Sequence, residues 1–154
     1  MTYDIVRWAD RRDEQRVMDL CHLLHKENGL FDMDEDSVRG MLRKAWNRDG
    51  GIVGVIGAPD KPLEGAICLC LEQMWYSKQW HLGELFNYVH PDHRRSDHAK
   101  ALIEFAKASA EKLKVPLIIG IISNHRTEAK VRLYERRLPK AGAFFVYNTA
   151  TAGG

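Results

Sequence analysis

Cysteine is scarce in this chain of 154 residues, which contains three copies. Three cysteines cannot all pair with one another, and Cys68 and Cys70 stand two apart on an expected strand, where a disulfide has poor geometry. No apolar run approaches the roughly 18 to 20 residues of a membrane helix. Asp4, Arg7 and Asp10 interrupt the segment in which a signal peptide has its apolar core. These absences predict reduced thiols, a cytoplasmic protein and no membrane partner.

A strong excess of either charge is absent too, because 23 Lys and Arg face 21 Asp and Glu and leave a net charge of +2. A dedicated nucleic-acid binder is therefore not expected. Hydrophobic residues at 45% and charged residues at 29% exclude collagen-like, disordered and disulfide-scaffold chains. The small total hides an uneven distribution. Residues 90–140 hold twelve Lys and Arg against six Asp and Glu, whereas the remaining residues hold eleven against fifteen.

The spacing of apolar residues predicts the element order β-α-α-β-β-β-α-β-α-β. A strand, a long amphipathic helix and an uninterrupted apolar run indicate a crossover between two parallel strands. The predicted fold class is therefore α/β (α+β), with a mixed sheet and helices on both faces. One domain is expected over residues 1–147, with a disordered tail over 148–154. The expected strands are 3–9, 52–56, 63–74, 82–89, 115–122 and 141–147, and the expected helices are 14–29, 36 or 37 to 46, 99–113 and 128–137.

The segment from Tyr88 to Ala99 is rich in basic groups and joins the end of an expected strand to a long helix. The free backbone N–H groups of a helix's first turn, together with the positive end of its dipole, attract anions. Arg94 and Arg95 add positive charge beside them, so a phosphate ligand is predicted. The alternative is a helix start capped by Ser96 or Asp97, with solvated arginines.

Two motifs in this half of the chain carry a family resemblance. The first reads Val89-His90-Pro91, then Arg94-Arg95-Ser96-Asp97-His98-Ala99, then Leu102. It resembles the acetyl-CoA signature of the GNAT superfamily of N-acetyltransferases, V-x-P-x-x-R/Q-x-x-G-x-G/A with a following leucine. The second, Leu133-Tyr134 with Gly142-Ala143-Phe144, is similar to the family's late L-Y-x-x-x-G-F segment. The element order also matches the family, and the short chain resembles its small bacterial or phage-type members.

The sequence departs from the family pattern at two places. Asp97 stands where the family usually has glycine, which puts a carboxylate near the expected pyrophosphate. Seven residues, Glu135 to Ala141, separate Tyr134 from Gly142, where the family usually has three. The longer turn reshapes the acceptor side if the fold is kept.

The resemblance implies a mostly antiparallel sheet whose two parallel strands splay apart around acetyl-CoA, the expected cosubstrate. It implies that Tyr134 is the general acid that protonates the departing thiolate; the alternative is packing on the core. A backbone N–H near Val89 would polarise the thioester carbonyl. The residues implied in cofactor binding are Tyr88, Val89, Arg94, Arg95, Ser96, Asp97, His98 and Ala99.

The acceptor is expected to be a primary amine, and such a group requires a base. A lysine-like amine with a pKa of about 10.4 is neutral in only about one molecule in 2,500 at pH 7. Glu84 is the first candidate for the base and Glu72 the second, acting directly or through water; each has a solvated strand residue as its alternative. The basic half of the chain suits the anionic cofactor, and the acidic half suggests a cationic acceptor.

Other features leave alternatives open. The acidic run Asp32, Asp34, Glu35 and Asp36 fits an amine-attracting loop or the capping of the second helix. Trp75, Tyr76 and Trp80 fit an acceptor pocket, a homodimer contact or core packing.

A metal site is not expected. His90, His93 and His98 lie near Cys68 and Cys70 in the sequence, but the cysteines lack zinc-finger spacing. The predicted function is an acetyl-CoA-dependent N-acetyltransferase that transfers acetyl directly to the amine. The alternative is a non-catalytic acyl-CoA-binding or interaction module of the same fold.

Overall fold

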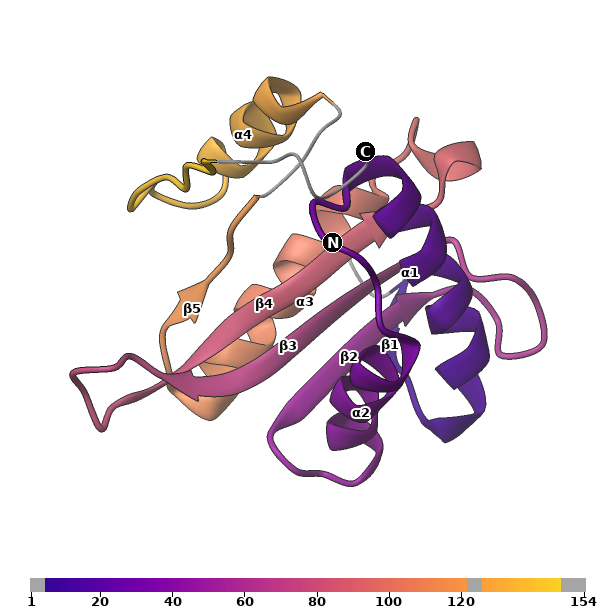
Figure 1. The fold of residues 1–154 in the computed structure, drawn as a ribbon, viewed down its shortest axis with the longest axis horizontal. Coiled ribbons are helices and arrows are strands. Elements are labelled where there is room, and N and C mark those ends of the chain that lie inside the picture. Colours follow the sequence, from indigo (N-terminus) through magenta and orange to yellow (C-terminus); the bar gives the residue numbers. More distant parts are fainter. Residues whose placement is uncertain (1–4, 122–125, 148–154) are drawn as a thin grey trace.

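A five-stranded sheet forms the centre of the computed structural model, which describes residues 5–121 and 126–147 (Figure 1). The strands lie in chain order, and every pair is antiparallel except β4 and β5, which run parallel. The sheet is therefore mixed and mostly antiparallel, as predicted. The strands are β1 Val6–Trp8, β2 Gly51–Ile56, β3 Gly65–Gln73, β4 Trp80–Val89 and β5 Leu117–Ile118.

Helices cover both faces of the sheet, in agreement with the predicted fold class (Figure 1). Because side chains alternate along a strand, neighbouring apolar residues of β2 and β3 enter two different cores. Helix α1 (Glu14–Asn28) and helix α2 (Glu35–Trp46) pack over the first core, and α3 (His98–Leu113) packs over the second. The buried strand residues of the first core are Val53, Val55, Ala66, Cys68 and Tyr88, and those of the second are Ile52, Ile56, Ile67, Leu69 and Leu82.

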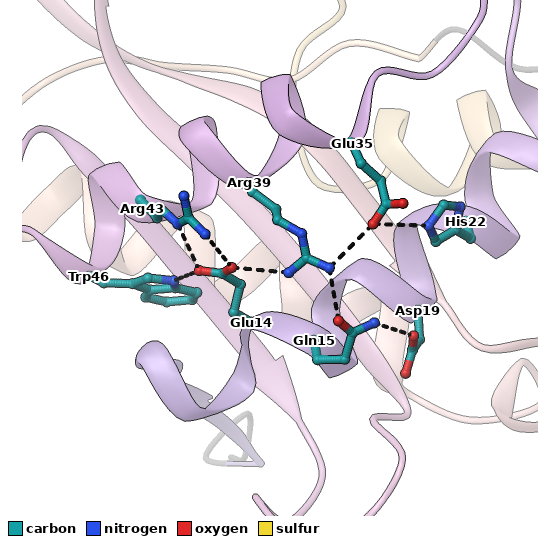
Figure 2. A network of polar contacts seen from close by, with 8 residues as sticks. All are labelled: Glu14, Gln15, Asp19, His22, Glu35, Arg39, Arg43 and Trp46. Atoms are coloured by element: carbon teal, nitrogen blue, oxygen red, sulfur yellow. Dashed lines mark hydrogen bonds and ion pairs between the residues drawn. The ribbon is translucent and has the colours of Figure 1, made fainter.

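A network of polar contacts joins α1 to α2 (Figure 2). The carboxylate of Glu14 accepts hydrogen bonds from Arg39 at 3.0 Å, from Arg43 at 3.1 Å and from the Trp46 indole at 3.1 Å. Glu14 begins α1, where the helix dipole also favours a negative charge. These contacts hold the pKa of the Glu14 carboxyl below its usual range, with the Arg43 hydrogen bond as the largest cause. The network fixes the two helices against each other.

Three short helices complete the described part of the chain: η1 (Arg11–Asp13), η2 (Pro91–His93) and α4 (Thr127–Glu135). Helix α4 lies beyond the end of the sheet and corresponds to the helix expected at 128–137 (Figure 1). Within the described ranges, each helix is too short or too polar to cross a membrane. The three cysteines are free thiols.

The two late strands differ most from the prediction. The strand expected at 115–122 is reduced to Leu117–Ile118, because within the described part of that range, 115–121, these two residues form the register with β4; residue 122 lies outside the described residues. The strand expected at 141–147 is wrong, since residues 141–147 adopt no regular structure and Phe145 and Tyr147 are 93% and 96% exposed. A segment with alternating apolar residues becomes an edge strand only if it pairs with a neighbouring strand. With two residues, β5 is too short to pair with residues 141–147. The disorder expected for 148–154 lies outside the described residues.

Candidate active site

A cleft of about 570 Å³ opens where β4 and β5 separate. The parallel pairing joins Leu82 to Leu117 and Gly83 to Ile118, and the two segments then part. Beyond that point, β4 forms one wall, residues after β5 form the second, and α4 contributes the third. The separation of two neighbouring strands therefore creates a cavity inside the layer of the sheet.

One extra residue in β4 decides which side chains enter the cleft. Cys68 faces Phe86 and Leu69 faces Glu84, so Leu85 has no partner in the ladder and forms a β-bulge. In a regular strand, two residues three apart point to opposite faces, but the bulge adds one residue to the count. Glu84 and Asn87 consequently share the face of the sheet that carries Leu69. Both line the cleft.

The carboxylate of Glu84 is held by neutral donors. Its Oε1 accepts a hydrogen bond from the backbone N–H of Gly120 at 3.3 Å, and its Oε2 accepts one from the Asn87 amide at 3.1 Å. Burial raises the pKa of Glu84 to about 7, and these two hydrogen bonds oppose that rise without cancelling it. A carboxyl group in this range exchanges protons readily at neutral pH.

Tyr134 reaches the same point from α4. Its phenol oxygen accepts a hydrogen bond from the Asn87 amide at 2.5 Å, so Asn87 bridges Tyr134 and Glu84 with its two N–H groups. Burial and the nearby Glu84 raise the pKa of Tyr134, which keeps the phenol protonated at neutral pH. The structure therefore brings together two of the three residues predicted as catalytic.

Sequence reasoning missed Asn87, the residue that joins this pair. Glu84 and Asn87 stand three apart in the sequence, and residues at this spacing point to opposite faces of a regular strand. Their spacing therefore predicts that the two side chains lie apart. Only the bulge at Leu85 places them together.

Glu72, the third predicted catalytic residue, lies apart from Glu84. It pairs with His81 across the β3–β4 ladder, on the face that carries Cys70. Its carboxylate lies 3.5 Å from the His81 ring, and its side chain is 44% exposed. Glu72 also lines the cleft, so the two candidate bases approach it from opposite faces of the sheet.

The predicted anion-binding segment occupies the turn between β4 and α3. Tyr88, Val89, Arg94 and Ala99 line the cleft. Arg94 donates to Glu27 at 2.9 Å and to the carbonyl of Val89 at 3.2 Å, and its guanidinium lies 5.2 Å from the centre of the Tyr88 ring. Glu27 also accepts a hydrogen bond from the Tyr88 hydroxyl at 2.9 Å. Arg94 thus ties the start of this turn to α1.

The remaining residues of the segment lie at the first turn of α3. The Ser96 hydroxyl accepts a hydrogen bond from the His98 backbone N–H at 3.2 Å, so Ser96, one residue before the N-cap Asp97, binds the first N–H of the helix. Asp97 makes no capping bond; its carboxylate is 78% exposed and lies 3.6 Å from the Lys100 ammonium. Arg95 is exposed. The unusual Asp97 side chain therefore points to solvent and carries a counter-charge.

A sequence model of the acetyltransferase (GNAT) family matches residues 3–138. The chain belongs to this family. The predicted family and enzyme class are confirmed by this match, and the fold is confirmed by solved structures of similar architecture. No curated protein sequence is similar enough to the chain to count as a match.

Three solved structures illustrate the fold that this GNAT chain shares. A ribosomal-protein-alanine N-acetyltransferase from Brucella melitensis biovar Abortus 2308 has 20% identity and a TM-score of 0.70, over 93% of this chain and 96% of that chain. AAC(6')-Iy, solved with the bisubstrate analogue CoA-S-monomethyl-acetylneamine, has 12% identity and a TM-score of 0.71, over 93% and 95%. The aminoglycoside 6'-N-acetyltransferase AAC(6')-IG from Acinetobacter haemolyticus has 13% identity and a TM-score of 0.68, over 93% and 96%.

The acidic run Asp32, Asp34, Glu35 and Asp36 leads into the first turn of α2 in this GNAT chain. Asp34 caps α2 by accepting a hydrogen bond from the Ser37 backbone N–H at 3.0 Å. Glu35 lies 3.2 Å from Arg39 and 3.7 Å from His22. Capping and pairing therefore account for two of the four acidic residues.

Core packing is the wrong interpretation of the aromatic residues near the β3–β4 turn. Trp75, Tyr76 and Trp80 are 94%, 69% and 52% exposed. The hairpin that carries them projects beyond the rest of the sheet (Figure 1). The described residues that line the cleft do not include them. The homodimer contact stays a prediction.

The histidines of the β4–α3 turn do not gather around the cysteines. Cys68 is buried in the core beneath α1 and α2, where desolvation raises the pKa of its thiol. His93 and His98 instead converge on Glu64, a residue that no sequence motif had selected.

Proposed function

We propose that this GNAT chain is an acetyl-CoA-dependent N-acetyltransferase that transfers acetyl directly to a primary amine in a ternary complex. The observation that carries the proposal is the Glu84–Asn87–Tyr134 cluster at the point where β4 and β5 separate. A proton acceptor and a proton donor in one cleft are the two groups that amide formation from an amine and a thioester requires.

The fit of acetyl-CoA rests on the cleft and on the segment from Tyr88 to Ala99. Backbone groups of Tyr88 and Val89 are proposed to bind the pantetheine arm, since both residues line the cleft. The first turn of α3 and the side chain of Arg95 are proposed to bind the pyrophosphate. Asp97 is compatible with this role because its carboxylate is exposed and lies near Lys100. When bound, acetyl-CoA supplies an activated acetyl thioester.

The remaining residues predicted to bind the cofactor also have proposed roles. Arg94 holds the turn through Glu27, Ser96 accepts a hydrogen bond from the His98 N–H, and the N–H groups of His98 and Ala99 belong to the first turn. Arg94 is therefore proposed to position the binding segment as well as to add charge.

Glu84 is proposed as the general base. It accepts a proton from the acceptor ammonium, directly or through one water, and so makes the neutral amine. Its raised pKa of about 7 lies closer to the pKa of the amine than the pKa of an ordinary carboxyl group does. Glu72 is the second candidate, and its greater exposure makes it better suited to attract a cation than to remove a proton.

Tyr134 is proposed as the general acid. Because its phenol stays protonated at neutral pH, it can donate to the departing thiolate, whose conjugate acid has a pKa of about 8.5. Asn87 holds the phenol oxygen toward the cleft.

The acceptor is proposed to be a cationic small-molecule amine. Glu72 and Glu84 both line the cleft, and a carboxylate lining favours a positively charged ligand. Two of the solved structures of the same fold are AAC(6') proteins, and one of them is an aminoglycoside 6'-N-acetyltransferase. Polyamines and aminoglycosides therefore come first in an acceptor screen, ahead of amino acids and peptides.

Isothermal titration with acetyl-CoA, followed by an acceptor screen with thiol detection, tests the proposal. Micromolar binding and thiol release with a cationic amine are expected. Absence of binding at high micromolar acetyl-CoA would remove the cofactor assignment. Binding without thiol release across a broad amine panel would favour the non-catalytic acyl-CoA-binding module instead.

A further inference from the structure

Glu64, His93 and His98 form a cluster on the turns at one end of the sheet. Glu64 immediately precedes β3, His93 ends η2, and His98 begins α3. The backbone around Glu64 is fixed on both sides, because its N–H donates to Ile56 and its carbonyl accepts from His90, each at 2.8 Å. Two separate connections of the chain therefore meet at one carboxylate.

The three side chains point at one another. One oxygen of Glu64, Oε1, lies 2.7 Å from His98 Nε2 and 3.3 Å from His93 Nδ1. The two imidazole rings are stacked, with centroids 5.8 Å apart and an angle of 6° between their planes. One nitrogen of each ring and one carboxylate oxygen all lie within 4.8 Å of one another.

We propose that Glu64, His93 and His98 bind a divalent first-row transition-metal ion, with Zn²⁺ as the best-suited member. Two imidazoles and one carboxylate are a ligand set that zinc accepts, with a water molecule in the fourth position. Zinc–nitrogen distances of about 2.0 to 2.1 Å place tetrahedral ligand atoms about 3.4 Å apart. The contact with His93 already has this length, and the contact with His98 must lengthen by about 0.7 Å to match.

The cluster is also accessible. The side chains of Glu64, His93 and His98 are 36%, 42% and 16% exposed, so an ion can enter from solvent and keep a water ligand. His90 lies beside the cluster, with its ring centroid 5.9 Å from that of His93, but its Nδ1 accepts a hydrogen bond from the Asp92 backbone at 3.1 Å. His90 is therefore a neighbour of the cluster and not one of the proposed ligands.

A bound ion would tie the turn between β4 and α3 to the connection between β2 and β3. Hydrogen bonds between imidazoles and one exposed carboxylate break and re-form easily, whereas three ligand bonds to one ion hold both connections at once. The site needs neither acetyl-CoA nor an acceptor, so its test is independent of the proposed function.

The first experiment titrates metal-free protein, with any affinity tag removed, with Zn²⁺ by calorimetry and with Co²⁺ by visible absorption. One equivalent is expected to bind, and Co²⁺ is expected to give the intense bands of tetrahedral coordination. The variants Glu64→Gln, His93→Gln and His98→Gln are each expected to lose affinity by about 10- to 100-fold or more, since even residues outside the ligand shell have effects of that size.

His90→Gln is the matched control, because it removes a histidine of the same turn and is expected to bind as the unchanged protein does. His22→Gln on α1 controls for binding elsewhere. The proposal would be overturned if the unchanged protein did not bind Zn²⁺. It would also be overturned if all variants bound Zn²⁺ equally well, or if affinity were lost only in a control variant. Circular dichroism of each variant shows that the fold is kept.

A second measurement does not depend on any variant. Zn²⁺ is expected to slow amide hydrogen exchange in residues 93–98 and around Glu64, while exchange in α2 stays unchanged. Binding that leaves exchange near both Glu64 and the histidines unaltered would place the ion elsewhere and overturn the assignment.

Discussion

Glu14 and Glu84 are two carboxylates with little exposure, and their surroundings have opposite effects on them. Glu14 faces two guanidinium groups and an indole, and these partners lower its pKa (Figure 2). Glu84 faces a backbone N–H and a side-chain amide, which are neutral, and burial raises its pKa to about 7. Charged partners stabilise the charge on Glu14, whereas neutral partners leave Glu84 able to take up a proton.

The difference separates a structural carboxylate from a reactive one. A carboxylate paired with arginine holds two helices together but is a poor base, because it is ionised far below neutral pH. A buried carboxylate with neutral partners lowers the stability of the fold when it is ionised, but its raised pKa makes it a better base. Substitutions in the α1–α2 network and in the cleft test this contrast.

The largest effect is expected for Glu84→Gln. Loss of the base should lower kcat about 10²- to 10⁴-fold, measured by thiol release at saturating amine. For the unchanged enzyme, kcat/KM should rise with pH through about 7, since Glu84 must be deprotonated to accept a proton. Glu72→Gln is the matched control, with a smaller loss expected mainly in KM. A larger kcat loss in Glu72→Gln would exchange the two roles.

Tyr134→Phe comes next. Removing the phenol should lower kcat about 10²-fold, because the departing thiolate loses its proton donor. The affinity for acetyl-CoA, measured by calorimetry, should stay unchanged, since the aromatic ring remains. An unaltered turnover rate would remove Tyr134 as the acid.

Stability measurements should give opposite signs for the two glutamates. At pH 8, Glu14→Gln should lower the free energy of unfolding by about 1 to 2 kcal/mol, because charge-assisted hydrogen bonds are lost. Glu84→Gln should raise it by about 1 to 3 kcal/mol, because a buried charge disappears. Chemical denaturation measures both values, and effects of the same sign would contradict the contrast.

The pH dependence follows from the same shifts. Glu84 has a raised pKa in the folded state, so its contribution to stability is present at acidic pH and is lost as pH rises through about 7. Glu14 has a lowered pKa, so its contribution is present at neutral pH and is lost as pH falls below the usual carboxyl range. Each Gln variant should remove its own part of the profile.

The smallest effect is expected for Asn87→Leu. Loss of the bridging amide should lower kcat about tenfold, in line with one or two hydrogen bonds. The midpoint of the kcat/KM profile should move to higher pH, because the amide lowers the pKa of Glu84. A reduced rate with an unchanged midpoint would indicate a structural role alone.

Periodicity predicted the helices and the antiparallel strands well, because each is specified by the local spacing of apolar residues, with a period of about 3.6 residues in a helix and alternation in a strand. Helices α1, α2 and α3 begin and end within a few residues of the predicted bounds. The apolar run 115–122 predicted a longer strand than forms: within residues 115–121 the register with β4 includes Leu117 and Ile118, and the chain then leaves the sheet to line the cleft through Gly120 and Ile121. Phe144 lines the cleft without belonging to a strand.

Only some of the site residues could be predicted from the sequence. Tyr134 and Glu84 could be selected because a motif and a residue type pointed to them. Asn87 and Glu64 could not, since one depends on the bulge at Leu85 and the other on the meeting of two distant turns. Contacts of this kind are set by tertiary structure and leave no spacing in the sequence.

The bulge has a consequence for how β4 can change in length. Residues before Leu85 and residues after it follow the two-residue alternation in opposite phase. Deleting Leu85 would remove the bulge and leave a regular strand in which Phe86, Asn87 and Tyr88 keep their present faces. Deleting two residues between Glu84 and Asn87 would instead place these two side chains on opposite faces. This part of β4 can therefore lose one residue, but not two, without dividing the pair of polar groups between the two faces of the sheet.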